Sequence, residues 1–139
     1  MFFIDTSAWV AFVSTDDTNH LVYKEIIGSS LTNHIALYTS NYVYCETITR
    51  LNTHADWHKT KQFVKLFQEC LRTKSVHNYW IDQNLETESL DFLDKYAEHR
   101  FSLTDATIAV LVKKHHIKTI LTTDGGFSKI GLDVLPKEI

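Results

Sequence analysis

The sequence contains few residues that break or cross-link the chain. Among 139 residues there are four Gly, one Pro and two Cys. So little Gly and Pro argues against a disordered chain, and a hydrophobic content of 44% is ordinary for globular domains. Because Cys45 and Cys70 both lie in helical, apolar patterns, we expect reduced core thiols and no disulfide framework. The sequence therefore predicts a single domain over residues 1–139.

Long hydrophobic runs and a strong excess of charge are also absent. No stretch approaches the roughly 20 apolar residues that span a bilayer. The apolar run Met1–Ile4 meets Asp5 too early for a signal peptide, so we expect a cytoplasmic protein that does not enter a membrane. The formal charge of −3 weakly disfavours nucleic-acid binding, but it becomes +1 if four carboxylates are neutralised by cations. Charge therefore neither supports nor excludes a nucleic-acid partner.

Apolar patterning predicts strands and helices that alternate along the chain. Short apolar or β-branched runs predict strands at residues 2–4, 35–38, 76–81, 119–123 and 132–135. Periodic spacing predicts helices at residues 7–13, 20–27, 57–72, 85–96 and 104–114. The second is expected to end near Gly28, and a further helix, capped by Ser40 or Asn41, is expected to carry Glu46. This alternation indicates an α/β fold, a three-layer α/β/α sandwich with a mainly parallel central sheet.

Four carboxylates that are far apart in the sequence fall at the ends of predicted strands or near the starts of predicted helices. They are Asp5, Glu46, Asp105 and Asp124. Ligands of open parallel sheets collect at the carboxyl ends of the strands, so we expect the four side chains to converge there. Such a cluster needs a cation to offset its repulsion, and oxygen ligands favour Mg²⁺ or Mn²⁺. The pattern predicts metal-dependent hydrolysis of a nucleic-acid backbone.

Each carboxylate also has a purely structural interpretation. Asp5 can cap the helix that follows it, and Ser102 with Asp105 has the spacing of a capping box. Asp124 precedes two glycines and can begin a turn. Glu46 differs, because a carboxylate among mostly apolar neighbours is costly unless it is paired or binds a ligand. The functional hypothesis therefore depends on the four residues in combination.

Ordered motifs along the chain resemble those of PIN-domain nucleases, and most of all the VapC-type toxins. The motifs are Phe3–Ser7, Glu46, Ser102–Ala106 and Leu121–Asp124. The likeness covers essentially the whole chain. It implies a PIN-like α/β/α endoribonuclease in which Asp5 and Asp105 hold Mg²⁺ or Mn²⁺ and in which Glu46 and Asp124 complete the catalytic acidic cluster.

The same resemblance implies two hydroxyl groups at the site. Ser7 and Thr123 would face the water shell of the metal and orient it. This sequence departs from the common pattern after Asp124, because Gly125-Gly126 stands where many relatives have a larger polar residue before the aromatic. We therefore expect the geometry around Asp124 to differ from that of those relatives.

The toxin resemblance also implies partners. An RNA substrate is expected, together with a small antitoxin that covers the acidic cleft, with an Arg reaching the carboxylates in place of metal. The hydrophobic surface of the helix at residues 57–72 would suit a homodimer.

Two other functions fit parts of the pattern. A magnesium-dependent phosphatase or dehalogenase would use Asp5 as a nucleophile, although such phosphatases usually have a second Asp where this chain has Ser7. A non-catalytic RNA- or protein-binding PIN-like module would keep the carboxylates as structural groups. A dinucleotide-binding enzyme is disfavoured because no Gly-x-Gly-x-x-Gly follows the first strand.

Overall fold

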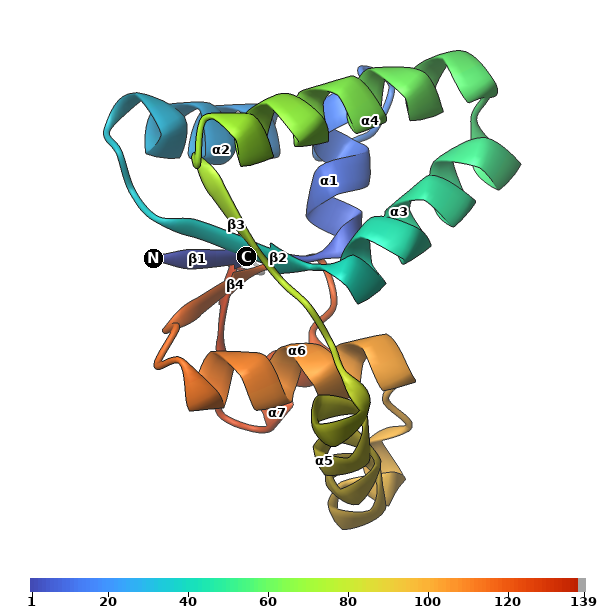
Figure 1. The fold of residues 1–139 in the computed structure, drawn as a ribbon, viewed down its shortest axis with the longest axis vertical. Coiled ribbons are helices and arrows are strands. Elements are labelled where there is room, and N and C mark those ends of the chain that lie inside the picture. The colour runs from blue at the N-terminus through green and yellow to red at the C-terminus, as the bar shows by residue number, and fades with distance from the viewer. Residues whose placement is uncertain (138–139) are drawn as a thin grey trace.

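A parallel sheet lies at the centre of the computed structural model, which describes residues 1–137 (Figure 1). Its strands in the described chain are β1 (Phe2–Ile4), β2 (Leu37–Ser40), β3 (Val76–Tyr79), β4 (Thr119–Leu121) and β5 (Asp133–Leu135). They follow the order β3-β2-β1-β4-β5, and every neighbouring pair is parallel. The central strands β1 and β4 are almost wholly apolar because helices cover both of their faces. The last two residues of the predicted domain, 138 and 139, lie outside the described residues.

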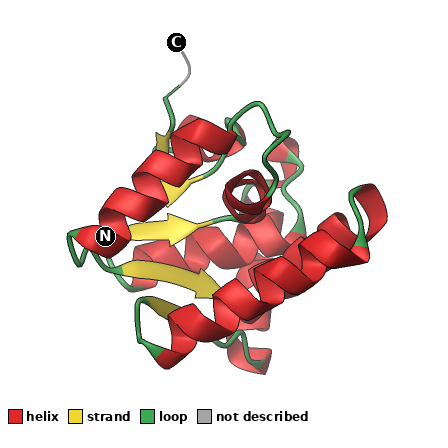
Figure 2. Ribbon diagram, turned by 90° about the horizontal axis from the view of Figure 1, so that it is seen from above, coloured by secondary structure: helices red, strands yellow, loops and turns green. Residues whose placement is uncertain are grey.

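Helices cover both faces of this sheet, as Figures 1 and 2 show. On one face lie α1 (Thr6–Val13), α2 (His20–Thr32), α3 (Asn41–His54) and α4 (Trp57–Arg72). On the other lie α5 (Gln83–Lys95), α6 (Leu103–Lys114) and α7 (Gly126–Lys129), with the 3₁₀ turn η1 (Ala97–His99) between α5 and α6. The predicted three-layer α/β/α arrangement is confirmed, and its sheet is parallel throughout.

Trp9 connects α1 to the other helices on its face of the sheet. Its side chain is 1% exposed, and its indole N–H donates a hydrogen bond of 3.2 Å to the Thr39 hydroxyl at the end of β2. Its ring packs edge-on against Phe63 and Phe67 of α4, with centroid separations of 5.5 and 5.8 Å. Since α1 follows β1 with only Asp5 between them, this packing holds the Asp5 backbone in place.

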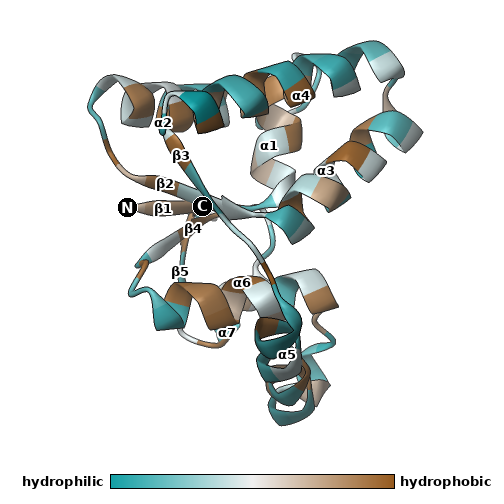
Figure 3. Cartoon of the chain, viewed as in Figure 1, coloured by the Kyte–Doolittle hydropathy of each residue, from teal (hydrophilic) through white to brown (hydrophobic). Residues whose placement is uncertain are grey.

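The helix α6 is buried on almost every side. Most of its residues are buried or partly buried, because the helix lies between the sheet and α5. Figure 3 accordingly shows a largely hydrophobic α6 beside a largely hydrophilic α5. Within residues 1–137, no helix is both long enough and apolar enough to cross a membrane.

The predicted end of α2 near Gly28 is wrong. The helix continues to Thr32, and its last turns contain hydroxyl groups that bond back to helix carbonyls. Ser30 Oγ donates to Ile26 O at 2.7 Å, and Thr32 Oγ1 donates to Gly28 O at 3.0 Å. His34 has a positive φ of 55° just after the helix, so it takes the left-handed turn expected of a glycine. The second strand consequently begins at Leu37, two residues later than predicted.

The prediction that both cysteines are core thiols is half wrong. Both thiols are free, and Cys70 is buried, but Cys45 is exposed. The buried positions of α3 are Val43, Thr47 and Leu51, which recur every four residues. Cys45 falls outside this row and faces solvent. The short helix α7 was also absent from the predicted elements, because four residues are too few for a periodic signal.

Candidate active site

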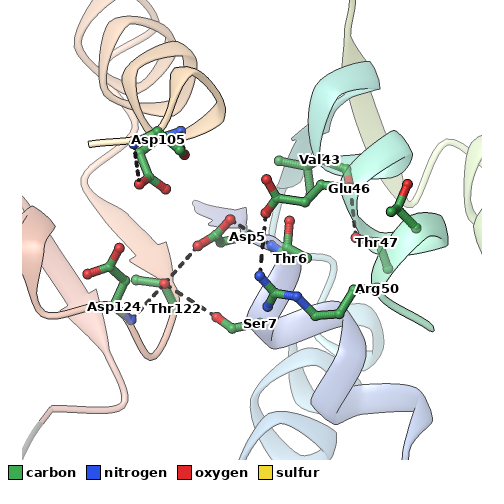
Figure 4. Close-up of polar contacts among 12 residues, drawn as sticks. Asp5, Thr6, Ser7, Val43, Glu46, Thr47, Arg50, Asp105, Thr122 and Asp124 are labelled. Carbon is green, nitrogen blue, oxygen red and sulfur yellow. Dashed lines mark hydrogen bonds and ion pairs between the residues drawn. The ribbon is translucent and has the colours of Figure 1, made fainter. Parts of the chain in front are cut away.

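A cavity of about 360 Å³ opens at the carboxyl ends of β1 and β4. The residues that line it are Asp5, Thr6, Ser7, Glu46, Arg50, Ser102, Asp105, Thr123 and Asp124. All four predicted carboxylates are therefore brought to one place, from four separate segments of the chain (Figure 4). This is the convergence that the sequence analysis expected from the carboxyl ends of parallel strands.

Asp5 is the N-cap of α1 and also lines this cavity. Its Oδ1 accepts a hydrogen bond of 2.7 Å from the Thr6 N–H, and its Oδ2 accepts one of 2.8 Å from the Thr122 hydroxyl. The pKa of Asp5 is raised from 3.8 to about 7, mainly by burial and to a smaller extent by the charges of Asp105 and Glu46, while the two hydrogen bonds act in the opposite direction. The structural and functional interpretations of Asp5 are thus compatible.

Asp105 belongs to a capping box at the start of α6. Its Oδ2 accepts from the Ser102 N–H at 3.1 Å, and its own N–H donates to the Ser102 hydroxyl at 3.0 Å. Burial raises the pKa of Asp105, and the neighbouring charges of Asp124 and Glu46 act in the same direction. Figure 4 places the Asp105 carboxylate across the cavity from Glu46.

Asp124 is held in a tight turn. Its N–H donates to the Thr122 hydroxyl at 3.0 Å, and its Oδ1 accepts from the Gly126 N–H at 2.8 Å. A Cβ at Gly126 would lie 3.1 Å from Asp124 Oδ1 and 3.1 Å from a ring carbon of Phe101. The glycine that departs from the family pattern therefore leaves room for the carboxylate and supplies the donor that orients it.

Glu46 enters the cavity from α3, with 35% of its side chain exposed. Arg50 lies one turn further along the same helix, and its Nη2 is 3.8 Å from Glu46 Oε1. Sequence reasoning missed Arg50. The i, i+4 spacing of the pair was the available signal.

Thr122 was also missed, although it joins three groups of the site. Its side chain is 1% exposed, and its hydroxyl donates to Asp5, accepts from the Asp124 N–H and lies 3.4 Å from the Ser7 hydroxyl. The two hydroxyl groups predicted at the metal were Ser7 and Thr123. Both residues line the cavity, and Ser7 Oγ accepts a hydrogen bond of 3.1 Å from the Thr123 N–H.

Comparison with known proteins identifies the family. The PIN-domain family model matches residues 2–132. This chain belongs to the PIN-domain family. The predicted membership of the PIN-domain family is thereby confirmed, and the match includes all four carboxylates of the cavity.

This PIN domain is homologous to a VapC-type toxin endonuclease. It is 28% identical over 138 residues to the 23S rRNA-specific endonuclease VapC20 from two strains of Mycobacterium tuberculosis, a match that covers 99% of this chain and 100% of the relative. The crystal structure of M. tuberculosis VapC20, described as a Sarcin-Ricin loop cleaving toxin, matches with a TM-score of 0.82 and 26% identity. That match covers 95% of this chain and 96% of the other. The PIN-like fold and the VapC-type resemblance are confirmed.

The lining of the cavity in this PIN domain fits a hard divalent cation. Among the described lining residues the metal-binding atoms are carboxylate and hydroxyl oxygens, and neither His nor Cys is present. The Thr6 hydroxyl is buried beside the cavity and has no hydrogen-bond partner within the described chain, so the site contains an unsatisfied polar group.

The carboxylates are nevertheless not arranged as a closed metal cage. Across residues 1–137, no three or more His, Cys, Asp or Glu side chains already form a group that could hold an ion. Instead, Asp105 and Asp124 are each bound to a nearby backbone N–H, and Glu46 is near Arg50. Mutual repulsion keeps like charges apart, so we expect a cation to draw them inward.

Replacing Thr122 by Val should weaken this site without changing its shape. The substitution leaves one oxygen of Asp5 and the N–H of Asp124 without their partner, so we expect a loss of about 1–3 kcal/mol in the free energy of unfolding. Groups that orient metal ligands typically contribute about 10–100-fold, so RNA cleavage should fall by that order. Denaturant unfolding and cleavage kinetics measure the two effects.

Thr119→Val is the matched control for this prediction. Thr119 begins β4, the strand that ends just before Thr122, and it is also buried. It donates a hydrogen bond of 2.9 Å to Asp133 but does not line the cavity. Cleavage that falls equally in both variants would show that Thr122 contributes only to folding.

Proposed function

We propose that this PIN domain is a Mg²⁺- or Mn²⁺-dependent endoribonuclease that acts as the toxin of a toxin–antitoxin pair. The observation that carries the proposal is the convergence of Asp5, Glu46, Asp105 and Asp124 around one cavity at the carboxyl edge of the sheet. Phosphodiester hydrolysis needs a cation to offset phosphate charge, and four carboxylates are suited to hold one. The family match over residues 2–132 supports one PIN-like domain as the catalytic unit.

Each carboxylate has a role in this proposal. Asp5 and Asp105 would bind the cation, because both are partly or wholly buried and each is oriented by hydrogen bonds. A bound Mg²⁺ or Mn²⁺ lowers the pKa of bound water and stabilises charge on the phosphodiester oxygens. Glu46 and Asp124 face the same cavity and can accept hydrogen bonds from the attacking water. The Thr122 hydroxyl fixes the positions of Asp5 and Asp124 relative to each other, because it hydrogen-bonds to both residues.

The substrate proposed is a structured ribosomal RNA. The support is the full-length homology to VapC20, a 23S rRNA-specific endonuclease. Such a substrate would place the activity in the cytoplasm.

By the same homology we propose an antitoxin that covers the acidic cavity. We also propose a homodimer that uses the exposed surface of α4, where Trp57 is 60% exposed. Light scattering of the purified chain tests the dimer.

Cleavage of defined RNAs tests the proposed function. Purified protein is incubated with a hairpin carrying the sarcin-ricin loop, and with a hairpin of the same composition and scrambled loop, in the presence of Mg²⁺, Mn²⁺ or EDTA. We expect one cut in the first hairpin with either metal and none with EDTA. Binding without cleavage under every condition would favour the non-catalytic module, and cutting that persists in EDTA would exclude the metal-dependent reaction.

A further inference from the structure

Arg50 brings a positive charge into an otherwise acidic cavity. It is the one Lys, Arg or His among the described residues that line the cavity. It lies on α3, one turn beyond Glu46, and 45% of its side chain is exposed. In Figure 4 its guanidinium points from α3 toward the space between Glu46 and Ser7. The group can therefore be reached by a molecule that enters the cavity.

The guanidinium of Arg50 is only weakly engaged within the protein. Its separation of 3.8 Å from Glu46 Oε1 is longer than a hydrogen bond, and no hydrogen bond from this group to any residue of 1–137 accompanies it. Arg72 of α4 shows the contrasting case, because two of its guanidinium nitrogens hydrogen-bond to the two oxygens of Glu69. The Arg50–Glu46 pair therefore leaves the N–H donors of the guanidinium free to bind another group.

A phosphate is the ligand that this arrangement fits. RNA carries a negative charge at every phosphate, and the carboxylates of the cavity repel it. A guanidinium is a planar fork of donors that binds phosphate through two parallel hydrogen bonds. Arg50 also lines a second cavity of about 280 Å³, whose polar lining includes Asp16, Asp17 and His54, so its guanidinium is the positive group shared by the two cavities.

We propose that Arg50 is a phosphate-binding residue of the active site, which holds an RNA phosphate at the α3 side of the acidic cavity. The inference rests on the proposed function, since it names a contact within the same site. It differs from a purely structural role, in which Arg50 would only offset the charge of Glu46. In that case the removal of Arg50 would change RNA binding and cleavage only through its effect on Glu46.

The test compares Arg50→Gln and Arg50→Lys with Arg72→Gln. Arg72 is a matched control because it is an exposed Arg that pairs with a Glu one turn away and does not line the cavity. Cleavage of the sarcin-ricin hairpin with Mn²⁺ gives kcat and KM, and binding of the same hairpin in EDTA is measured over a series of salt concentrations. Mn²⁺ binding is followed separately by calorimetry.

We expect Arg50→Gln to lower kcat/KM by about 10–100-fold, Arg50→Lys by less, and Arg72→Gln not at all. In EDTA, Arg50→Gln should reduce the slope of log K against log salt by about 0.7–0.9, the value for one lost phosphate contact. Mn²⁺ affinity should be retained or increased, because removing a positive charge near the carboxylates does not weaken cation binding.

Three results would overturn the inference. The first is an Arg50→Gln variant that cleaves and binds RNA as the wild type does, which leaves the proposed function intact. The second is an effect on RNA binding in EDTA that disappears in a Glu46→Gln background, because Arg50 would then act only through Glu46. The third is an unchanged salt slope. If the wild type does not cleave RNA, the proposed function fails, and binding in EDTA still decides the role of Arg50.

Discussion

Replacing Asp5 by Asn is expected to reduce RNA cleavage by at least about a hundredfold while the protein stays folded. Asn keeps an oxygen for the Thr6 N–H and an amide group for the Thr122 hydroxyl, so the turn into α1 survives. It removes the charge that would hold the cation. Asp105→Asn should have a similar effect, because Asp105 is the other proposed metal ligand. Single-turnover cleavage with saturating Mn²⁺ measures both losses.

The control for this prediction is Asp91→Asn. Asp91 is exposed on α5 and does not line the acidic cavity, so the same change of charge there should leave cleavage unaltered. Calorimetric titration with Mn²⁺ should show lost or weakened binding in the Asp5 and Asp105 variants only. Wild-type cleavage rates in either of these variants would exclude that residue as a metal ligand.

The metal-free protein should lose stability as pH rises from about 4 to about 7. Burial raises the pKa of Asp5 from 3.8 to about 7, so over this range the folded protein keeps a proton that the unfolded chain has released. The free energy of unfolding therefore decreases with rising pH through this window, and above it the full cost of an ionised buried carboxylate is present. The raised pKa of Asp105 acts in the same direction.

Thermal unfolding near pH 5 and near pH 8, with EDTA and with Mg²⁺, measures this dependence. We expect the contribution of Asp5 to be on the order of 2–4 kcal/mol, and a saturating cation should restore much of it at the higher pH. Asp5→Asn should unfold at a higher temperature than the wild type near pH 8 in EDTA, and should lose the response to Mg²⁺. A wild-type transition that rises with pH in EDTA would contradict the assignment of a raised pKa to Asp5.

The elements of this PIN domain were largely predictable from the sequence. The limits of α4 at Trp57 and Arg72 were predicted correctly because its apolar residues keep a helical period over sixteen residues. Ser40 and Asn41 were the two predicted caps of α3, and the structure has Ser40, whose hydroxyl accepts from the free N–H of Val43. Strand ends were predicted less well, because pairing with neighbouring strands decides where a strand of three or four residues stops.

The positions of the carboxylates at element boundaries were also local information. Asp5 follows an apolar run, and Asp105 stands in a capping box, so both could be recognised as candidates before the fold was known. Their local role as helix caps persists in the structure. Local spacing could not separate a capping carboxylate from a metal-binding one, because the two roles use the same side chain at the same place.

The sequence by itself therefore determined the parallel α/β architecture and the candidate acidic residues, because hydrophobic periods and caps act over a few neighbouring residues. Only the tertiary structure decided which groups complete the site. The Thr122 hydroxyl reaches Asp5 from 117 positions away, and the Arg50 guanidinium joins the cavity because α3 packs beside α1. Such contacts arise when the carboxyl ends of separate strands meet at one edge of the sheet, and no local pattern encodes that meeting.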